Sequence, residues 1–124
     1  MNNERRNYPK VALETEANLL ISGVVRSATV LNLSPSGVQM ECRRQLVERM
    51  AEQKRDSGLY PDFDLEFTLP ANEPARTRVK SSCSVTHCRR LSQYTYHLDL
   101  NFVNLSDTDE KRLSEFLHHT ATSQ

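Results

Sequence analysis

The chain has no tryptophan, only three glycines and no excess charge of either sign, and each shortage counts against a class of protein. Its sixteen basic and sixteen acidic residues cancel, whereas general nucleic-acid or membrane binders usually carry a basic excess. Single-stranded nucleic acid also requires aromatic stacking platforms, for which tryptophan is well suited. Three glycines leave no glycine-rich loop to hold phosphates. Any anion must therefore be recognised by local clusters of basic residues.

Long apolar runs are also missing. No segment approaches the roughly 20 residues needed to span a bilayer. Residues 1–10 are polar and charged, unlike a secretion signal. We therefore expect a cytoplasmic protein with no membrane insertion. A chain of 124 residues can form one domain, 1–124, with a core that needs no disulfides or metal. The odd number of cysteines agrees with reduced thiols, and they are Cys42, Cys83 and Cys88.

Segments in which apolar and polar residues alternate predict half-buried β-strands. The clearest alternation covers residues 63–69. A segment near 24–31 has no single apolar face, because its valines fall on both sides. On the third strand, Val38, Met40 and Cys42 are expected to point inward. The other strands are predicted at 11–21, 79–87 and 96–102.

Two segments instead have the apolar spacing of amphipathic helices. The first covers about 43–56 and is expected to end at Ser57-Gly58. Its apolar residues are Leu46, Val47, Met50 and Ala51. The second covers 106–119, with Ser106 as the N-cap and carboxylates in its first turn. Its apolar stripe requires a partner, either one barrel mouth or another subunit, and consists of Leu113, Phe116 and Leu117.

This order of segments predicts a mainly β fold, a six-stranded antiparallel β-barrel with an inserted short helix and a C-terminal helix. Closing the sheet into a barrel removes exposed strand edges. Within the single domain, residues 1–10 are interpreted as a flexible basic arm, 11–105 as the barrel with its inserted helix, and 106–119 as the C-terminal helix.

Two short stretches carry the functional signal. The first, Asn32-Leu33-Ser34-Pro35-Ser36-Gly37, has the composition of a turn between two strands. The side chains of Asn32 and Ser34 can bond to nearby backbone, and Gly37 tolerates positive φ. The second, Arg5-Arg6-Asn7-Tyr8-Pro9-Lys10, places three cations just before the first strand. Most turns of this composition only connect strands, so the combination of both stretches matters.

Together these stretches resemble the PilZ domain family, whose signatures are RxxxR in an N-terminal arm and [DN]xSxxG in a downstream turn. The turn matches in full, and the arm matches with Lys10 in place of the second arginine. The resemblance implies a six-stranded barrel that binds cyclic di-GMP, with no other cofactor. It implies a ligand site formed by Arg5, Arg6, Lys10, Asn32, Ser34 and Gly37.

The chemistry of these residue types suits such a ligand. An arginine can bond bidentately to guanine or phosphate and stack on a base. Lys10 keeps the charge for a phosphate but lacks the planar fork that reads guanine. Asn32 offers one carbonyl acceptor where an aspartate would offer two charged oxygens. We expect the arm to become ordered when the ligand binds, which would provide a switch.

Other groups of residues give weaker functional signals. Cys83, His87, Cys88 and His97 could suggest a metal, but strand alternation puts Cys83 and His87 on one face and Cys88 on the other. We expect no metal site, and cysteines that serve as small apolar residues. No nucleophile elbow accompanies a Ser/His/Asp set, so we expect no catalytic residues and no enzyme. The pairs Arg43-Arg44 and Arg89-Arg90 are either solvated or an extension of the ligand site.

Three functions are therefore compared. The first is a cyclic di-GMP receptor that acts on an unidentified protein partner. The second is a PilZ-like protein-interaction module that does not bind the nucleotide, which the lysine at position 10 and the inserted helix favour. The third is an unrelated barrel for single-stranded nucleic acid, which the charge balance disfavours, so we expect no DNA or RNA partner.

Overall fold

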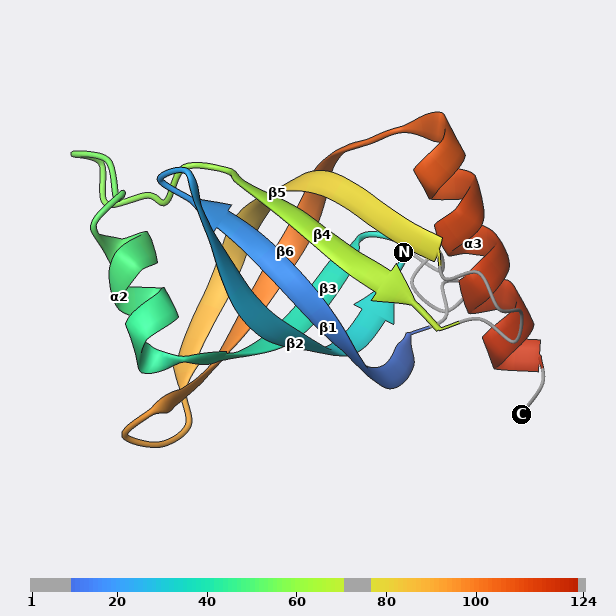
Figure 1. The fold of residues 1–124 in the computed structure, drawn as a ribbon, viewed down its shortest axis with the longest axis horizontal. Helices are drawn as coiled ribbons and strands as arrows, with labels where there is room; N and C mark the ends of the chain where they lie inside the picture. The colour runs from blue at the N-terminus through green and yellow to red at the C-terminus, as the bar shows by residue number, and fades with distance from the viewer. Residues whose placement is uncertain (1–9, 71–76, 123–124) are drawn as a thin grey trace, which may run out of the picture.

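The computed structural model describes residues 10–70 and 77–122. Six strands form a closed barrel in the order β1-β2-β3-β6-β5-β4, and every neighbouring pair is antiparallel (Figure 1). This confirms the predicted fold. The elements are β1 (Val11–Ile21), β2 (Val24–Ser34), β3 (Gly37–Arg43), α2 (Arg44–Ala51), β4 (Phe63–Leu69), β5 (Thr77–Arg90), β6 (Thr95–Leu105) and α3 (Asp107–Thr122).

The barrel interior is filled by the apolar residues that alternate along the strands. Phe67 and Phe102 stack across it with ring centroids 6.1 Å apart. The three residues predicted to point inward from β3 are buried. Each strand contributes at least one side chain that is at most 2% exposed, among them Leu19, Val30, Met40, Leu65, Val79 and Leu98.

The change of face within β2 after Val30 is explained by a β-bulge. The register with β3 shifts between Val30 and Asn32. Val30 and Leu33 are therefore both 0% exposed in the interior, although strict alternation would place them on opposite faces. A bulge re-aims the side chains that follow it. Here it places Asn32 opposite Gln39 on the outer face of the barrel.

A second irregularity corrects the reading of β5. The register with β6 shifts between Val85 and His87, which places His87 opposite Asp99. Cys83 is buried, but the His87 side chain is 79% exposed. The prediction that these two residues share a face is therefore wrong, because the alternation is interrupted between them. Among the described residues, no three metal-binding side chains are grouped closely enough to hold a metal ion.

The two helices lie at different ends of the barrel (Figure 1). α2 is shorter than predicted: it ends at Ala51, which is exposed, and is followed by i→i+3 backbone bonds from Gln53 and Lys54. α3 packs on its own barrel, against β5 and β1. Its predicted cap is present, since Asp109 N donates to Ser106 Oγ at 3.1 Å. In the described part of the chain, neither helix is long and apolar enough to cross a membrane.

Candidate functional site

The turn between β2 and β3 is tighter than the sequence suggested. Ser34 pairs directly with Gly37, so only Pro35 and Ser36 connect the strands. Ser34 Oγ lies 3.2 Å from Ser36 Oγ. The carbonyl of Ser36 accepts a 2.8 Å hydrogen bond from Phe102 N. This bond holds the turn against β6 at the rim of the barrel.

Gly37 is required for a reason other than positive φ. Gly23 and Gly58 are the described glycines with positive φ, and Gly37 is not among them. The tolerance of glycine for positive φ is therefore not what this position requires. A Cβ at this position would overlap the carbonyl oxygen of Leu100 and lie 3.1 Å from Cα of Asn101. Glycine is needed because the backbone of β6 passes too close for any side chain.

A pocket of about 240 Å³ opens beside this turn. Its lining includes four of the predicted site residues, Lys10, Asn32, Ser34 and Gly37. The other two, Arg5 and Arg6, lie outside the described residues. Lys10 is the first residue that the structure describes, so the predicted basic arm is joined to the pocket wall. Of the basic stretch, Lys10 is therefore the residue that the structure places beside the turn.

The pocket also includes polar residues that the sequence analysis did not identify. Gln39, Asp99 and Asn101 contribute to its lining. Gln39 lies opposite both Asn32 and Asp99 on the neighbouring strands. Strand alternation from Gly37 could have placed Gln39 on this face. No local signal could have placed Asp99, because its proximity depends on the pairing of β6 with β3.

The two arginine pairs do not extend this pocket. Arg43 lies opposite Thr95 and Arg90 opposite Tyr96, at the ends of their strands nearest the β5–β6 loop. Neither arginine pair belongs to the pocket lining. Of the two readings left open by the sequence, the structure favours solvated surface residues.

Two of the three cysteines behave as small apolar core residues. Cys42 and Cys83 are buried and free, whereas Cys88 is free and exposed. Burial raises the pKa of the Cys42 and Cys83 thiols to about 12 in each case. Such thiols remain protonated at neutral pH and are poor nucleophiles.

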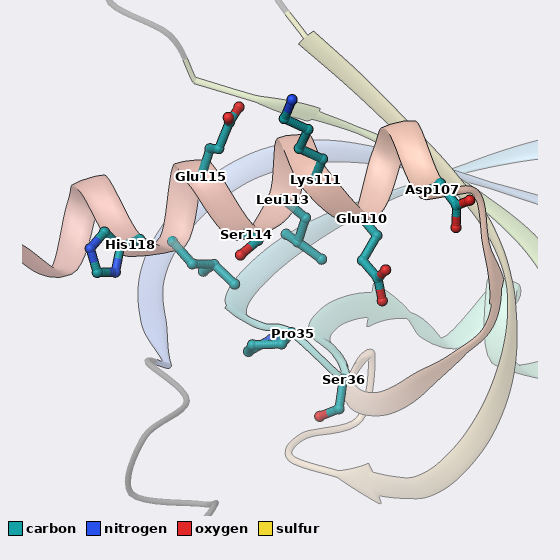
Figure 2. Close-up of a pocket in the computed structure, with 10 residues that line it drawn as sticks. Pro35, Ser36, Asp107, Glu110, Lys111, Leu113, Ser114, Glu115 and His118 are labelled. Atoms are coloured by element: carbon teal, nitrogen blue, oxygen red, sulfur yellow. The ribbon is translucent and has the colours of Figure 1, made fainter.

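A larger hollow of about 750 Å³ lies between α3 and the other side of the Pro35–Ser36 turn. Figure 2 shows Leu113 and Glu110 pointing towards the turn and Glu115 pointing away from it. Leu113 and Leu117 line this hollow, yet each is only 1% exposed and belongs to the hydrophobic core. We call this hollow the α3 groove. None of the four predicted ligand residues that the structure describes, Lys10, Asn32, Ser34 and Gly37, lines it.

A family model for the PilZ domain matches residues 4–119. The chain belongs to the PilZ domain family. The match covers both the arm and the turn that carried the sequence resemblance. No curated protein sequence matches the chain.

Solved structures share the fold of this PilZ domain at low identity. The Bacillus subtilis inhibitor of motility MotI/DgrA matches with a TM-score of 0.75 and 14% identity over 97% of this chain and 53% of that one. The Borreliella burgdorferi PlzA protein in complex with c-di-GMP gives 0.60 and 8% over 93% and 52%. The PilZ domain of Escherichia coli YcgR with c-di-GMP gives 0.54 and 14% over 96% and 95%. The present chain thus spans about half the length of MotI and PlzA.

Proposed function

We propose that this PilZ domain is a cytoplasmic receptor for cyclic di-GMP rather than an enzyme. The observation that carries the proposal is the pocket beside the Pro35–Ser36 turn, because it gathers every described member of the predicted ligand set. The family match supports it, as do two neighbours of the same fold whose structures contain c-di-GMP.

The pocket is suited to one part of the ligand. Its volume of about 240 Å³ is below the ~300–1,000 Å³ that is typical for whole small-molecule sites. We therefore assign one guanine to the pocket, where Asn32 and Ser34 offer hydrogen-bonding groups at the base edge. Lys10 is placed for a phosphate as a point charge. The rest of the dinucleotide must then be contacted by residues outside the barrel.

The arm supplies these contacts in our proposal. Arg5 and Arg6 would reach over the bound nucleotide, since they follow each other only a few residues before Lys10. A guanidinium can bond phosphate or guanine bidentately and stack on the base. Ordering the arm over the ligand costs conformational entropy, and contacts with the bound ligand offset that cost. The arm would therefore become ordered when the ligand binds. The altered surface of the arm would then be recognised by a protein partner.

Titration calorimetry with cyclic di-GMP and the full chain tests the receptor proposal. We expect saturable heat and a rise in melting temperature, since a ligand at a hundred times its Kd stabilises by about 2.7 kcal/mol. Arg6→Ala should abolish binding. Arg49→Ala is the matched control, because Arg49 lies on α2, away from the turn, and pairs with Glu52 just after that helix at 2.8 Å. No heat and no thermal shift with the wild-type chain would contradict the proposal.

Hydrogen exchange tests the arm. We expect the amides of residues 1–10 to become protected when cyclic di-GMP is added, while the amides of α2 remain unchanged. Binding without protection of the arm would support the receptor proposal but contradict the proposal that the arm becomes ordered.

The second candidate function is a protein-interaction module that does not bind the nucleotide, and the lysine at position 10 favours it. Partner capture that is the same with and without cyclic di-GMP would support it.

A further inference from the structure

An acidic side chain lines the pocket although the proposed ligand is an anion. Asp99 on β6 lies in the wall formed by Asn32 and Gln39. A carboxylate repels phosphate, so it cannot serve as a phosphate ligand. It does accept hydrogen bonds from N–H donors. Its position therefore points to the base of the nucleotide rather than to its backbone.

The register of the barrel places these residues in one row on the outer face. Gln39 on β3 lies directly opposite Asn32 on β2 and, on its other side, directly opposite Asp99 on β6. Cβ atoms of directly opposed residues are about 4.5–5.5 Å apart. The ends of the Gln39 and Asp99 side chains can therefore reach the same edge of one base.

The hydrogen bonds within the row set which groups remain for a ligand. Asn32 Nδ2 donates to Gln39 Oε1 at 2.8 Å, which uses the carbonyl of Gln39 and leaves its amide N–H groups as donors. Asp99 Oδ2 is 3.7 Å from His87 Nδ1, beyond hydrogen-bond distance. The Asp99 side chain is 44% exposed, so its carboxylate is accessible to a ligand.

We propose that Gln39 and Asp99 together read the Watson–Crick edge of guanine and make the site select guanine over adenine and hypoxanthine. Gln39 Nε2 would donate to guanine O6, and the Asp99 carboxylate would accept from N1–H and the 2-amino group. Adenine presents an amino donor in place of O6 and an acceptor in place of N1–H, so it mismatches both residues. Hypoxanthine lacks only the 2-amino group. This inference rests on the proposed function.

The sign of one substitution separates this role from a passive surface charge. Asp99→Asn removes a negative charge beside an anionic ligand, so electrostatics alone predicts tighter binding of cyclic di-GMP. Our proposal predicts weaker binding, by roughly 5- to 150-fold, the discrimination that a bidentate base contact provides. Titration calorimetry measures the difference directly. Glu41→Gln is the matched control, because Glu41 is an exposed carboxylate on β3 outside the pocket lining.

Cyclic di-IMP, whose hypoxanthine bases lack the 2-amino group, identifies the group that Asp99 contacts. The wild-type chain should bind cyclic di-GMP more tightly than cyclic di-IMP, and Asp99→Asn should bring the ratio of the two affinities close to one. Gln39→Glu is the second variant, and it should lose cyclic di-GMP because an acceptor then faces O6. Melting temperatures near the wild-type value establish that each variant is folded.

The outcomes distinguish this inference from the proposed function. If the wild-type chain binds no cyclic di-GMP, the receptor proposal itself fails. If it binds, and Asp99→Asn leaves the affinity unchanged or raises it, the guanine-reading role is overturned while the receptor stands. If Asp99→Asn weakens cyclic di-GMP and cyclic di-IMP equally, Asp99 does not contact the 2-amino group and the proposed selectivity is overturned.

Discussion

The two hollows that meet at Ser36 differ in the elements that form their walls, strands for the smaller one and α3 for the larger one. The smaller pocket is formed by β2, β3 and β6 together with Lys10, which precedes β1, and polar side chains such as Asn32 share its lining with the core residues Leu33 and Leu100. The larger α3 groove is lined in part by Leu113 and Leu117, which also belong to the hydrophobic core. The larger hollow includes none of the described residues of the predicted ligand set, whereas the smaller pocket includes all four. We expect substitutions of the polar pocket residues to change ligand binding with little effect on stability. Substitutions of Leu113 and Leu117 should instead lower stability with little effect on ligand binding.

Gly37→Ala should have the largest effect and should change both stability and ligand binding. Gly37 lines the pocket and also packs closely against the backbone of β6. Its new Cβ would overlap backbone of Leu100. We expect a loss of unfolding free energy above the ~1–3 kcal/mol of ordinary overpacking, since backbone must move. Urea unfolding measures it. Gly23→Ala is the control, where the space is open and only the positive φ of 78° opposes a side chain. Equal losses for both variants would contradict the role of close approach.

Leu113→Ala tests the groove side of the comparison. The residue is 1% exposed, so we expect a loss of about 2–5 kcal/mol in unfolding free energy. The affinity for cyclic di-GMP should be unchanged at a temperature where the variant is folded. Lys111→Ala, an exposed position on α3, should alter stability by less than about 0.5 kcal/mol. A clear fall in affinity for Leu113→Ala would mean that the groove is coupled to the pocket.

Alkaline pH should weaken the barrel on which both hollows depend. Burial raises the pKa of Cys42 and Cys83 from 9.0 to about 12. Between these values the unfolded chain releases the thiol protons and the folded chain keeps them, so stability falls as pH rises. Urea unfolding at pH values from about 8 to about 11 measures the slope. The double variant Cys42→Ala/Cys83→Ala should show a smaller slope; an unchanged slope would assign it to other groups.

Ser106→Ala should have a smaller effect on the groove side. Ser106 Oγ caps α3 by accepting from Asp109 N at 3.1 Å. Loss of an N-cap costs about 1 kcal/mol. Thermal unfolding measures the loss, and Ser106→Asp should restore stability because aspartate also caps helices. Failure of aspartate to restore it would show that the hydroxyl acts in another way.

Lys10→Arg should have the smallest effect, and it should change ligand affinity without changing stability. Lys10 lines the pocket, and an arginine there adds a planar fork to the same charge. We expect cyclic di-GMP to bind a few-fold more tightly, roughly the 1 kcal/mol scale of one added hydrogen bond. Titration calorimetry measures it, and the melting temperature without ligand should not change. Weaker binding would mean that Lys10 has been assigned to the wrong part of the ligand.

The order of strands and helices, the inward residues of β3 and the cap at Ser106 were all predictable from the sequence. Each depends on neighbours in the chain, through alternation, helical spacing or capping chemistry. The turn motif and the basic arm were equally visible, because both are continuous stretches. The phase of β2, the outward turn of His87 and the reason for Gly37 were not predictable. They depend on bulges and on the passage of β6, which no local pattern reports.

The sequence by itself determined which residues alternate and where the motif lies, since these are properties of a few consecutive residues. Tertiary structure alone decided that Asp99 lies beside Gln39, because barrel closure pairs β3 with β6. It also decided that Asn32 faces outward, through the bulge after Val30. The physical reason is that strand register is set by packing against distant segments of the chain.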